Sequence, residues 1–175
     1  TVEGDLTDPA SRAAAVEGID AVVFTHGTHG GEAGVRDIDY GGVRNVLEAI
    51  GGRPVRVALM TAIGVTVREG SYNQSSKTHD WKRRAERLVR ASGHPYTIVR
   101  PGWFDYNDPD QHHLHFLQGD NRRAGNSSDG VIARSQIADV LVASLPSPGA
   151  DKKTLELVAE AGRIEVATVP YALDD

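Results

Sequence analysis

The residues of this 175-residue chain that are best suited to chemistry are a carboxylate, a hydroxyl and an ammonium group, far apart in the sequence. Asp5 could accept a hydrogen bond from an adenine amino group, and the backbone N–H of Leu6 could donate one to the ring. Asp5 is equally suited to capping a turn. Thr61 could polarise a substrate carbonyl, although threonine is also common in strands. Lys82 could reach a ribose hydroxyl, or form a simple surface pair with Glu86.

Two further segments combine glycine with groups that suit a bound sugar or ring. Thr25-His26-Gly27 follows an apolar run, where glycine lets a ribose or nicotinamide approach the backbone closely; a tight turn is the alternative. Pro101-Gly102-Trp103 follows another apolar run and turns the chain outward. Trp103 and Phe104 could then stack against a planar ring, or pack in the core.

Alternating strand and helix patterns place these segments at strand ends. Four apolar runs predict strands at 20–25, 56–61, 96–100 and 154–159, and the last alternates more, as expected nearer a sheet edge. Residues 1–6 resemble the end of a further strand and the turn after it. Amphipathic helical patterns occupy the intervals, including a short helix that Asp8 and Pro9 begin.

Helices between successive strands require a parallel sheet with right-handed crossovers. The predicted fold class is therefore α/β, a doubly wound parallel sheet, with residues 1–175 in one domain. Ligands of such sheets bind outside the carboxyl ends of the strands. The binding edge is therefore expected just after Asp5, Thr25, Thr61 and Arg100.

Two segments have the composition of a phosphate loop and of a metal site, but their spacing does not support either. The glycine-rich stretch 27–34 lacks a helix start at the offset of a phosphate loop, because the helical pattern begins only near Asp39; a mobile glycine loop is favoured. Segment 108–115 holds two Asp and three His, but His112, His113 and His115 would point in different directions, so no metal site is predicted. The irregular interval 103–130 predicts a loop or lid on the substrate side.

The composition argues against a nucleic-acid-binding, membrane-spanning or secreted protein. There are 19 basic and 24 acidic residues, giving a formal net charge of −5 spread along the chain, so no basic face for nucleic acid is expected. No apolar run predicts a membrane span, and no signal-peptide pattern opens the chain. The absence of cysteine fits a reducing, cytoplasmic location.

In their order, these segments resemble the atypical and extended short-chain dehydrogenases/reductases, especially the NmrA-like, NAD(P)H-binding branch. The resemblance runs from Gly4 to about Glu160. It rests on the segments GDLTDP (4–9), DAVVFT (20–25), YGGVRNVLEAI (40–50), MTAIGV (60–65), DWKRRAERLVRASG (80–93), YTIVRPG (96–102) and DGVIARSQIADVLVASL (129–145), followed by KTLELVAE (153–160).

The resemblance implies a Rossmann-like domain that binds NAD(P)H, with NADP slightly favoured, and an unidentified small-molecule substrate. It implies that Asp5 and Leu6 hold the adenine and that Lys82 holds the nicotinamide ribose hydroxyls. The remaining cofactor-binding residues it implies line the ribose and nicotinamide: Thr25, His26, Gly27, Thr61, Ala62, Pro101, Gly102 and Trp103.

The chain departs from the family pattern at functional positions. The catalytic tyrosine of the family lies four residues before the lysine, where this chain has Thr78, whose hydroxyl is too weak an acid to replace it. Asp39 stands in place of an asparagine, and Thr61-Ala62 in place of two serines. The glycine-rich turn and helix that bind the pyrophosphate do not precede Thr1, so we expect the first strands and the phosphate loop to be missing.

Three functions remain open. The first is a reductase of a small carbonyl or quinone-like substrate by direct hydride transfer, with Lys82 in the catalytic site and Thr61 or solvent supplying the proton. The second is a redox-sensing module that binds NAD(P)H without turnover, which the lost tyrosine favours. The third is a fragment with no function of its own, whose exposed sheet edge would promote association, including a homodimer.

Overall fold

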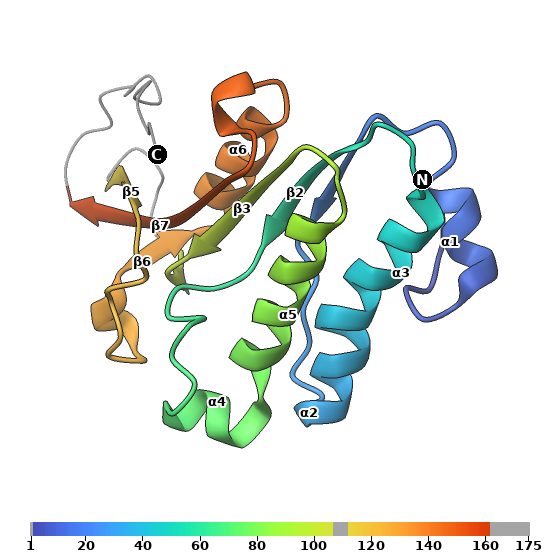
Figure 1. Ribbon diagram of the computed structural model, residues 1–175. Helices are drawn as coiled ribbons and strands as arrows, with labels where there is room; N and C mark the ends of the chain where they lie inside the picture. The colour runs from blue at the N-terminus through green and yellow to red at the C-terminus, as the bar shows by residue number, and fades with distance from the viewer. Residues whose placement is uncertain (1, 107–111, 162–175) are drawn as a thin grey trace.

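A computed structural model describes residues 2–106 and 112–161 and contains a sheet built around parallel strands (Figure 1). The parallel part has the order β1 (Ala21–Phe24), β2 (Arg56–Met60), β3 (Tyr96–Pro101) and β7 (Lys153–Ala161). Beyond β7 lie β6 (Val131–Ala133) and β4 (Trp103–Asp105), parallel to each other. Both β6 and β5 (His112–Leu117) pair antiparallel with β7.

Helices cover both faces of this sheet, because alternate residues of the central strands are apolar on each side. Val57, Leu59 and Ile98 belong to one core cluster, with residues of α3 (Gly41–Ile50) and α5 (Thr78–Ala91). Ala58 and Val99 belong to a second cluster, with residues of α6 (Arg134–Ser144). The predicted doubly wound, Rossmann-like α/β fold is therefore confirmed (Figure 1).

Helix ends follow the predicted signals. The Asp8 carboxylate accepts a hydrogen bond from the Ser11 backbone N–H (3.3 Å) at the start of α1 (Pro9–Ala15). Gly51 (φ 60°) and Gly93 (φ 80°) occupy the left-handed region just after α3 and α5, where glycine is not strained. The shorter helical elements are α4 (Ser71–Ser76), η3 (Ser127–Asp129) and η4 (Pro148–Ala150).

The glycine-rich segment differs from the prediction. Gly31 to Gly34 form the short helix α2 (Gly31–Gly34), which continues into a π-helical turn, η1 (Val35–Tyr40), and then into α3. The predicted glycine loop, 27–34, was therefore wrong from Gly31 onward, and the helix begins earlier than the predicted start near Asp39. Val35 and Asp39 are buried, so tertiary packing of η1 stabilises a helix that local propensity does not favour.

Two strand predictions and one loop prediction also need correction. The opening residues form no strand within the described chain, and Val2 is exposed. The last predicted strand, β7, is central rather than near an edge; its polar residue Glu156 is buried in contact with Arg100. The interval 103–130 contains β4, β5 and η3, so it is not a continuous loop. Leu114 and Phe116 alternate with histidines in β5 and pack on the second cluster.

Among the described residues, no helix is long and apolar enough to cross a membrane. No group of three or more His, Asp or Glu side chains in the described chain could hold a metal ion. Asp108 and Asp110, from the acidic and histidine-rich segment, lie outside the described residues.

Candidate functional site

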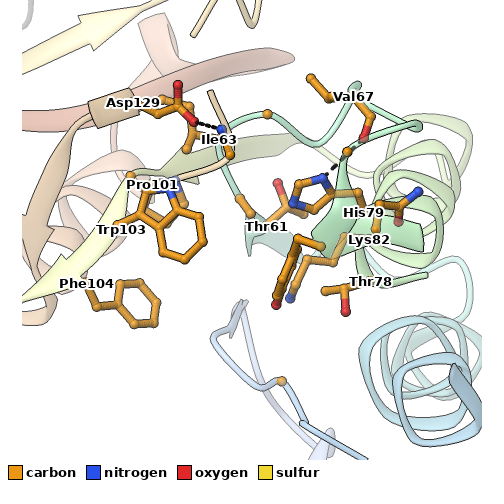
Figure 2. Close-up of a pocket in the computed structure, with 18 of the residues that line it drawn as sticks. Thr61, Ile63, Val67, Thr78, His79, Lys82, Pro101, Trp103, Phe104 and Asp129 are labelled. Atoms are coloured by element: carbon orange, nitrogen blue, oxygen red, sulfur yellow. Dashed lines mark hydrogen bonds between the residues drawn. The ribbon is translucent and has the colours of Figure 1, made fainter. Parts of the chain in front are cut away.

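A cavity of about 580 Å³ lies at the carboxyl ends of β1, β2 and β3, where a doubly wound sheet binds its ligands. Loops after the three strands meet there with the start of α5 and with segment 123–134, as the close-up in Figure 2 shows. Its lining includes most of the predicted site residues: Thr25, His26, Gly27, Thr61, Ala62, Lys82, Pro101, Gly102 and Trp103.

A buried ion pair stands in the wall of this cavity. Lys82 Nζ lies 2.7 Å from Asp39 Oδ1, and the side chains are 14% and 1% exposed. The other carboxylate oxygen of Asp39 accepts a hydrogen bond from the Thr28 backbone N–H at 3.1 Å. The π-helical turn η1 and helix α5 pack together and carry the two charges. Asp39 is thus a site residue that sequence analysis noted as a departure and gave no role.

The Thr61 hydroxyl is engaged in a buried hydrogen bond within the protein. It donates a hydrogen bond to Glu86 Oε1 at 2.8 Å, and Arg100 binds both oxygens of the same carboxylate (2.9 and 2.8 Å). Burial raises the pKa of Glu86, but the hydrogen bonds and charge of Arg100 outweigh it and hold that pKa below its usual range. The Glu86 carboxylate is therefore ionised at neutral pH, and the Thr61 proton points to it rather than to a substrate.

The position of Glu86 rules out the surface pair with Lys82 that the spacing of the two residues suggested. It accepts from Arg90, and its side chain is fully buried, so it is not a surface partner of Lys82. Lys82 and Glu86 instead carry separate interactions, one with Asp39 and the other with the strand residue Arg100.

Thr78, at the position of the family tyrosine, offers no replacement acid. Its side chain is buried, and its hydroxyl lies 2.7 Å from the Ser76 hydroxyl. The next residue, His79, lines the cavity, with Nδ1 3.5 Å from the Val67 carbonyl oxygen (Figure 2). Burial lowers the pKa of His79, so the imidazole is neutral at pH 7. No sequence pattern pointed to His79, because a lone histidine on a helix carries no motif.

Three of the predicted site residues, His26, Leu6 and Gly102, make close contacts inside the fold. The ring of His26 lies across the start of α3, with Nε2 2.9 Å from the Ile38 carbonyl oxygen. A Cβ on Gly42 would lie only 3.0 Å from this Nε2 and from Leu6 Cδ1. A Cβ on Gly102 would lie 2.5 Å from the Gly130 carbonyl oxygen, so glycine is needed there for packing.

Asp5 and Leu6 lie apart from the cavity lining. Asp5 Oδ1 accepts hydrogen bonds from the backbone N–H and the hydroxyl of Thr7, both at 2.7 Å, which hold the pKa of Asp5 below its usual range. The Leu6 carbonyl oxygen accepts from Asn45 at 2.8 Å. The structure therefore does not bring these two residues together with Lys82, and their adenine-binding role stays a prediction.

Lys82 and Asp39 are the charged groups in the cavity wall that could hold a ribose. A vicinal diol can donate to the Asp39 carboxylate and accept from the Lys82 ammonium at the same time. Gly27 faces the pair: a Cβ there would lie 3.4 Å from Asp39 Oδ1 and 3.7 Å from Lys82 Nζ. A side chain at position 27 would therefore pack directly against the pair.

Comparison with known proteins bears on the family and the fold of the chain. The chain is 30% identical to an uncharacterised chloroplastic protein of Arabidopsis thaliana, over 90% of this chain and 54% of that protein, and so spans about half its length. A solved Bacillus halodurans structure, named for an NAD-dependent epimerase/dehydratase, has a TM-score of 0.75 at 21% identity, over 91% of this chain and 72% of that one. An oxidoreductase from Lactococcus lactis has a TM-score of 0.71 at 17% identity, over 95% and 74%.

The two structures share the fold of this chain. The family described as NAD(P)H-binding matches residues 1–148, which include both partners of the ion pair and all the strand ends around the cavity. The chain therefore belongs to the NAD(P)H-binding family.

Proposed function

We propose that this chain binds NAD(P)H as an oxidoreductase that reduces a small carbonyl or quinone-like substrate. The observation that carries the proposal is the Lys82–Asp39 pair, which lines the cavity beside Gly27 at the carboxyl ends of the parallel strands. When bound, the reduced nicotinamide supplies a hydride. Lys82 and Asp39 would hold the adjacent ribose by its hydroxyls, and Thr61 and Ala62 line the cavity after β2.

Solvent is the proton source in this proposal. The Thr61 hydroxyl donates its hydrogen bond to Glu86, and the buried Thr78 hydroxyl is hydrogen-bonded to Ser76, so neither is a free acid. The acceptor must then be one whose reduced form takes a proton from water without a strong enzymatic acid. Quinones and conjugated carbonyls meet this requirement better than isolated ketones, because their reduced anions are delocalised.

Calorimetric titration of the purified protein with NADPH, and in parallel with NADH, tests the binding step. Removing both members of the pair, Asp39→Asn with Lys82→Met, avoids leaving a buried charge unpaired. We expect the double variant to fold and to bind about 10–100-fold more weakly, the loss of one or two hydrogen bonds to charged groups. Arg87→Met, at an exposed position of α5 that does not line the cavity, is the matched control. Unchanged affinity in the double variant would overturn the proposed ribose site.

A second candidate is a sensor that binds the cofactor without chemistry. The contact between Thr78 and Ser76 favours it, because the tyrosine position holds a buried, hydrogen-bonded hydroxyl. Oxidation of NADPH, followed by absorbance at 340 nm over a panel of quinones and carbonyls, separates the two candidates. Turnover with any acceptor supports the reductase, whereas tight binding without turnover across the panel supports the sensor.

A further inference from the structure

The end of the cavity away from the ion pair is lined by partly exposed aromatic side chains. Trp103 and Phe104, on β4, are 38% and 45% exposed, and Tyr72, on α4, is 40% exposed. The rings of Tyr72 and Trp103 meet edge to face, with centroids 6.2 Å apart. Figure 2 shows Trp103 and Phe104 on one side of the cavity and Lys82 on the other. Exposed aromatics that gather at a cavity mouth mark a binding surface for flat apolar groups.

Arg134, the first residue of α6, lies among these rings. Its guanidinium carbon is 4.5 Å from the centroid of Phe104 and 5.1 Å from that of Tyr106. Stacking uses the faces of the guanidinium and leaves the N–H groups at its edge directed outward. No ion pair joins Arg134 to a carboxylate elsewhere in residues 2–106 and 112–161. A stacked arginine of this kind is prepared to bind a carboxylate or phosphate.

The neighbouring charges make this end of the cavity positive. Arg123 also lines it; its Nε donates to the Asp120 carbonyl oxygen at 3.0 Å, which leaves its terminal N–H groups available. The carboxylate here, Asp129, is buried and accepts from the backbone N–H groups of Ala124 and Gly125, both at 2.7 Å. Asp129 is occupied by backbone donors, and Asp39, the other carboxylate in the lining, is paired with Lys82. Neither acid is therefore paired with the two arginines at the cavity mouth.

We propose that this end of the cavity binds a planar conjugated acceptor that carries an anionic group. The ring system lies against Trp103 and Phe104, and the carboxylate or phosphate binds the edge of Arg134. This substrate class rests on the proposed reductase function, since the ring must lie within reach of the nicotinamide. The two-electron reduction of a quinone-type ring consumes one hydride from NAD(P)H and one proton from water, and yields the hydroquinone and NAD(P)⁺.

Binding without cofactor tests the ligand class separately from turnover. The sequence has two tryptophans, so Trp81→Phe makes Trp103 the only one, and a bound conjugated ring should quench its fluorescence. Two matched pairs of probes share a ring and differ in charge. Riboflavin and riboflavin 5′-phosphate test a phosphate, and 2-(hydroxymethyl)anthraquinone and anthraquinone-2-carboxylate test a carboxylate.

We expect the anionic member of at least one pair to bind about 10-fold more tightly than its neutral partner, as expected for a hydrogen bond to a charged group. The pair that shows the difference identifies the anion. Arg134→Met should abolish it while keeping a side chain over Phe104, and Arg87→Met should not. Phe104→Leu should weaken both members of a pair equally.

Equal affinity within both pairs, or a difference that persists in Arg134→Met, would overturn the assignment. So would the absence of quenching by all four probes. If charge-selective binding holds but no NADPH is oxidised with any probe, the anionic ring site stands and the reductase function fails.

Discussion

Lys82 and Asp39 form a buried ion pair, 2.7 Å apart, between helix α5 and the π-helical turn η1. Burying either charge alone is costly, since the desolvation of an ion is repaid only by its partner. This pair therefore bears on stability as well as on cofactor binding, and the two effects can be separated by substitution.

Lys82→Met is expected to destabilise the fold by about 3–5 kcal/mol, because Asp39 is left charged and buried. The double variant, with Asp39→Asn added, should recover most of that loss. Urea unfolding at pH 7, followed by circular dichroism, measures both. If the single and double variants were equally stable, the pair would not be buried in the way described.

Glu86 and Glu156 share Arg100 but should respond differently to neutralisation. Glu86 accepts from Thr61, from Arg90 and twice from Arg100, whereas Glu156 accepts once from Arg100 and once from a backbone N–H. Burial raises the pKa of Glu156, so a neutral side chain suits its position. At pH 7 we expect Glu86→Gln to cost about 3 kcal/mol and Glu156→Gln about 1 kcal/mol or less.

The stability that the Glu86 carboxylate contributes should depend on pH. The pKa of Glu86 is held below its ordinary value in the folded protein, so its contribution is fully present above that ordinary value. It is lost as the pH falls through the lower, folded-state pKa. Urea unfolding from pH 8 to pH 4 should show the Glu86→Gln deficit shrinking at the acid end. A deficit that grows on acidification would contradict the assignment of Glu86 as ionised.

Sequence patterns predicted the parallel strands and the helices between them, and most of the predicted site residues lie in the cavity lining. They succeeded where apolar periodicity is strong, as in β2 and α3. They missed η1, because Val35 and Asp39 are buried by contacts with α5 that no local pattern encodes. They also missed β5, where His113 and His115 alternate with Leu114 and Phe116 and leave only a short apolar pattern.

From the sequence, the candidate site could be placed only at the carboxyl ends of the strands, without the contacts between its side chains. Which hydroxyl or carboxylate is free depends on partners distant in sequence, as Thr61 and Glu86 show across 25 residues. Arg134 illustrates the same limit. Its side chain meets Phe104 and Tyr106 because α6 begins beside β4, and that depends on the pairing of β4 with β6.

His79 is expected to titrate below the ordinary pKa of a histidine, 6.5. Burial is the main cause; Lys82 acts in the same direction, while the Val67 carbonyl, Asp120 and Asp80 oppose it. Between the lowered value and 6.5 the unfolded chain binds more protons, so stability is lost as the pH falls through this range. A two-dimensional NMR titration, with His79→Asn to assign the resonance, measures the midpoint. A midpoint at or above 6.5 would show that the ring is exposed or charged.

Gly27 and Gly102 both line the cavity but should fail in different ways when changed to alanine. In Gly102→Ala the new Cβ would lie 2.5 Å from the Gly130 carbonyl oxygen, and rigid backbone contacts of this kind cost about 1–3 kcal/mol or more.

In Gly27→Ala the new Cβ meets Asp39 Oδ1 at 3.4 Å and Lys82 Nζ at 3.7 Å, which the fold accommodates. That methyl group covers the face of the ion pair proposed to hold the ribose. Thermal unfolding should therefore place Gly27→Ala near the unsubstituted protein and Gly102→Ala well below it, while NADPH titration shows a clear loss of affinity in Gly27→Ala. Full affinity in a folded Gly27→Ala variant would mean that the ribose lies elsewhere.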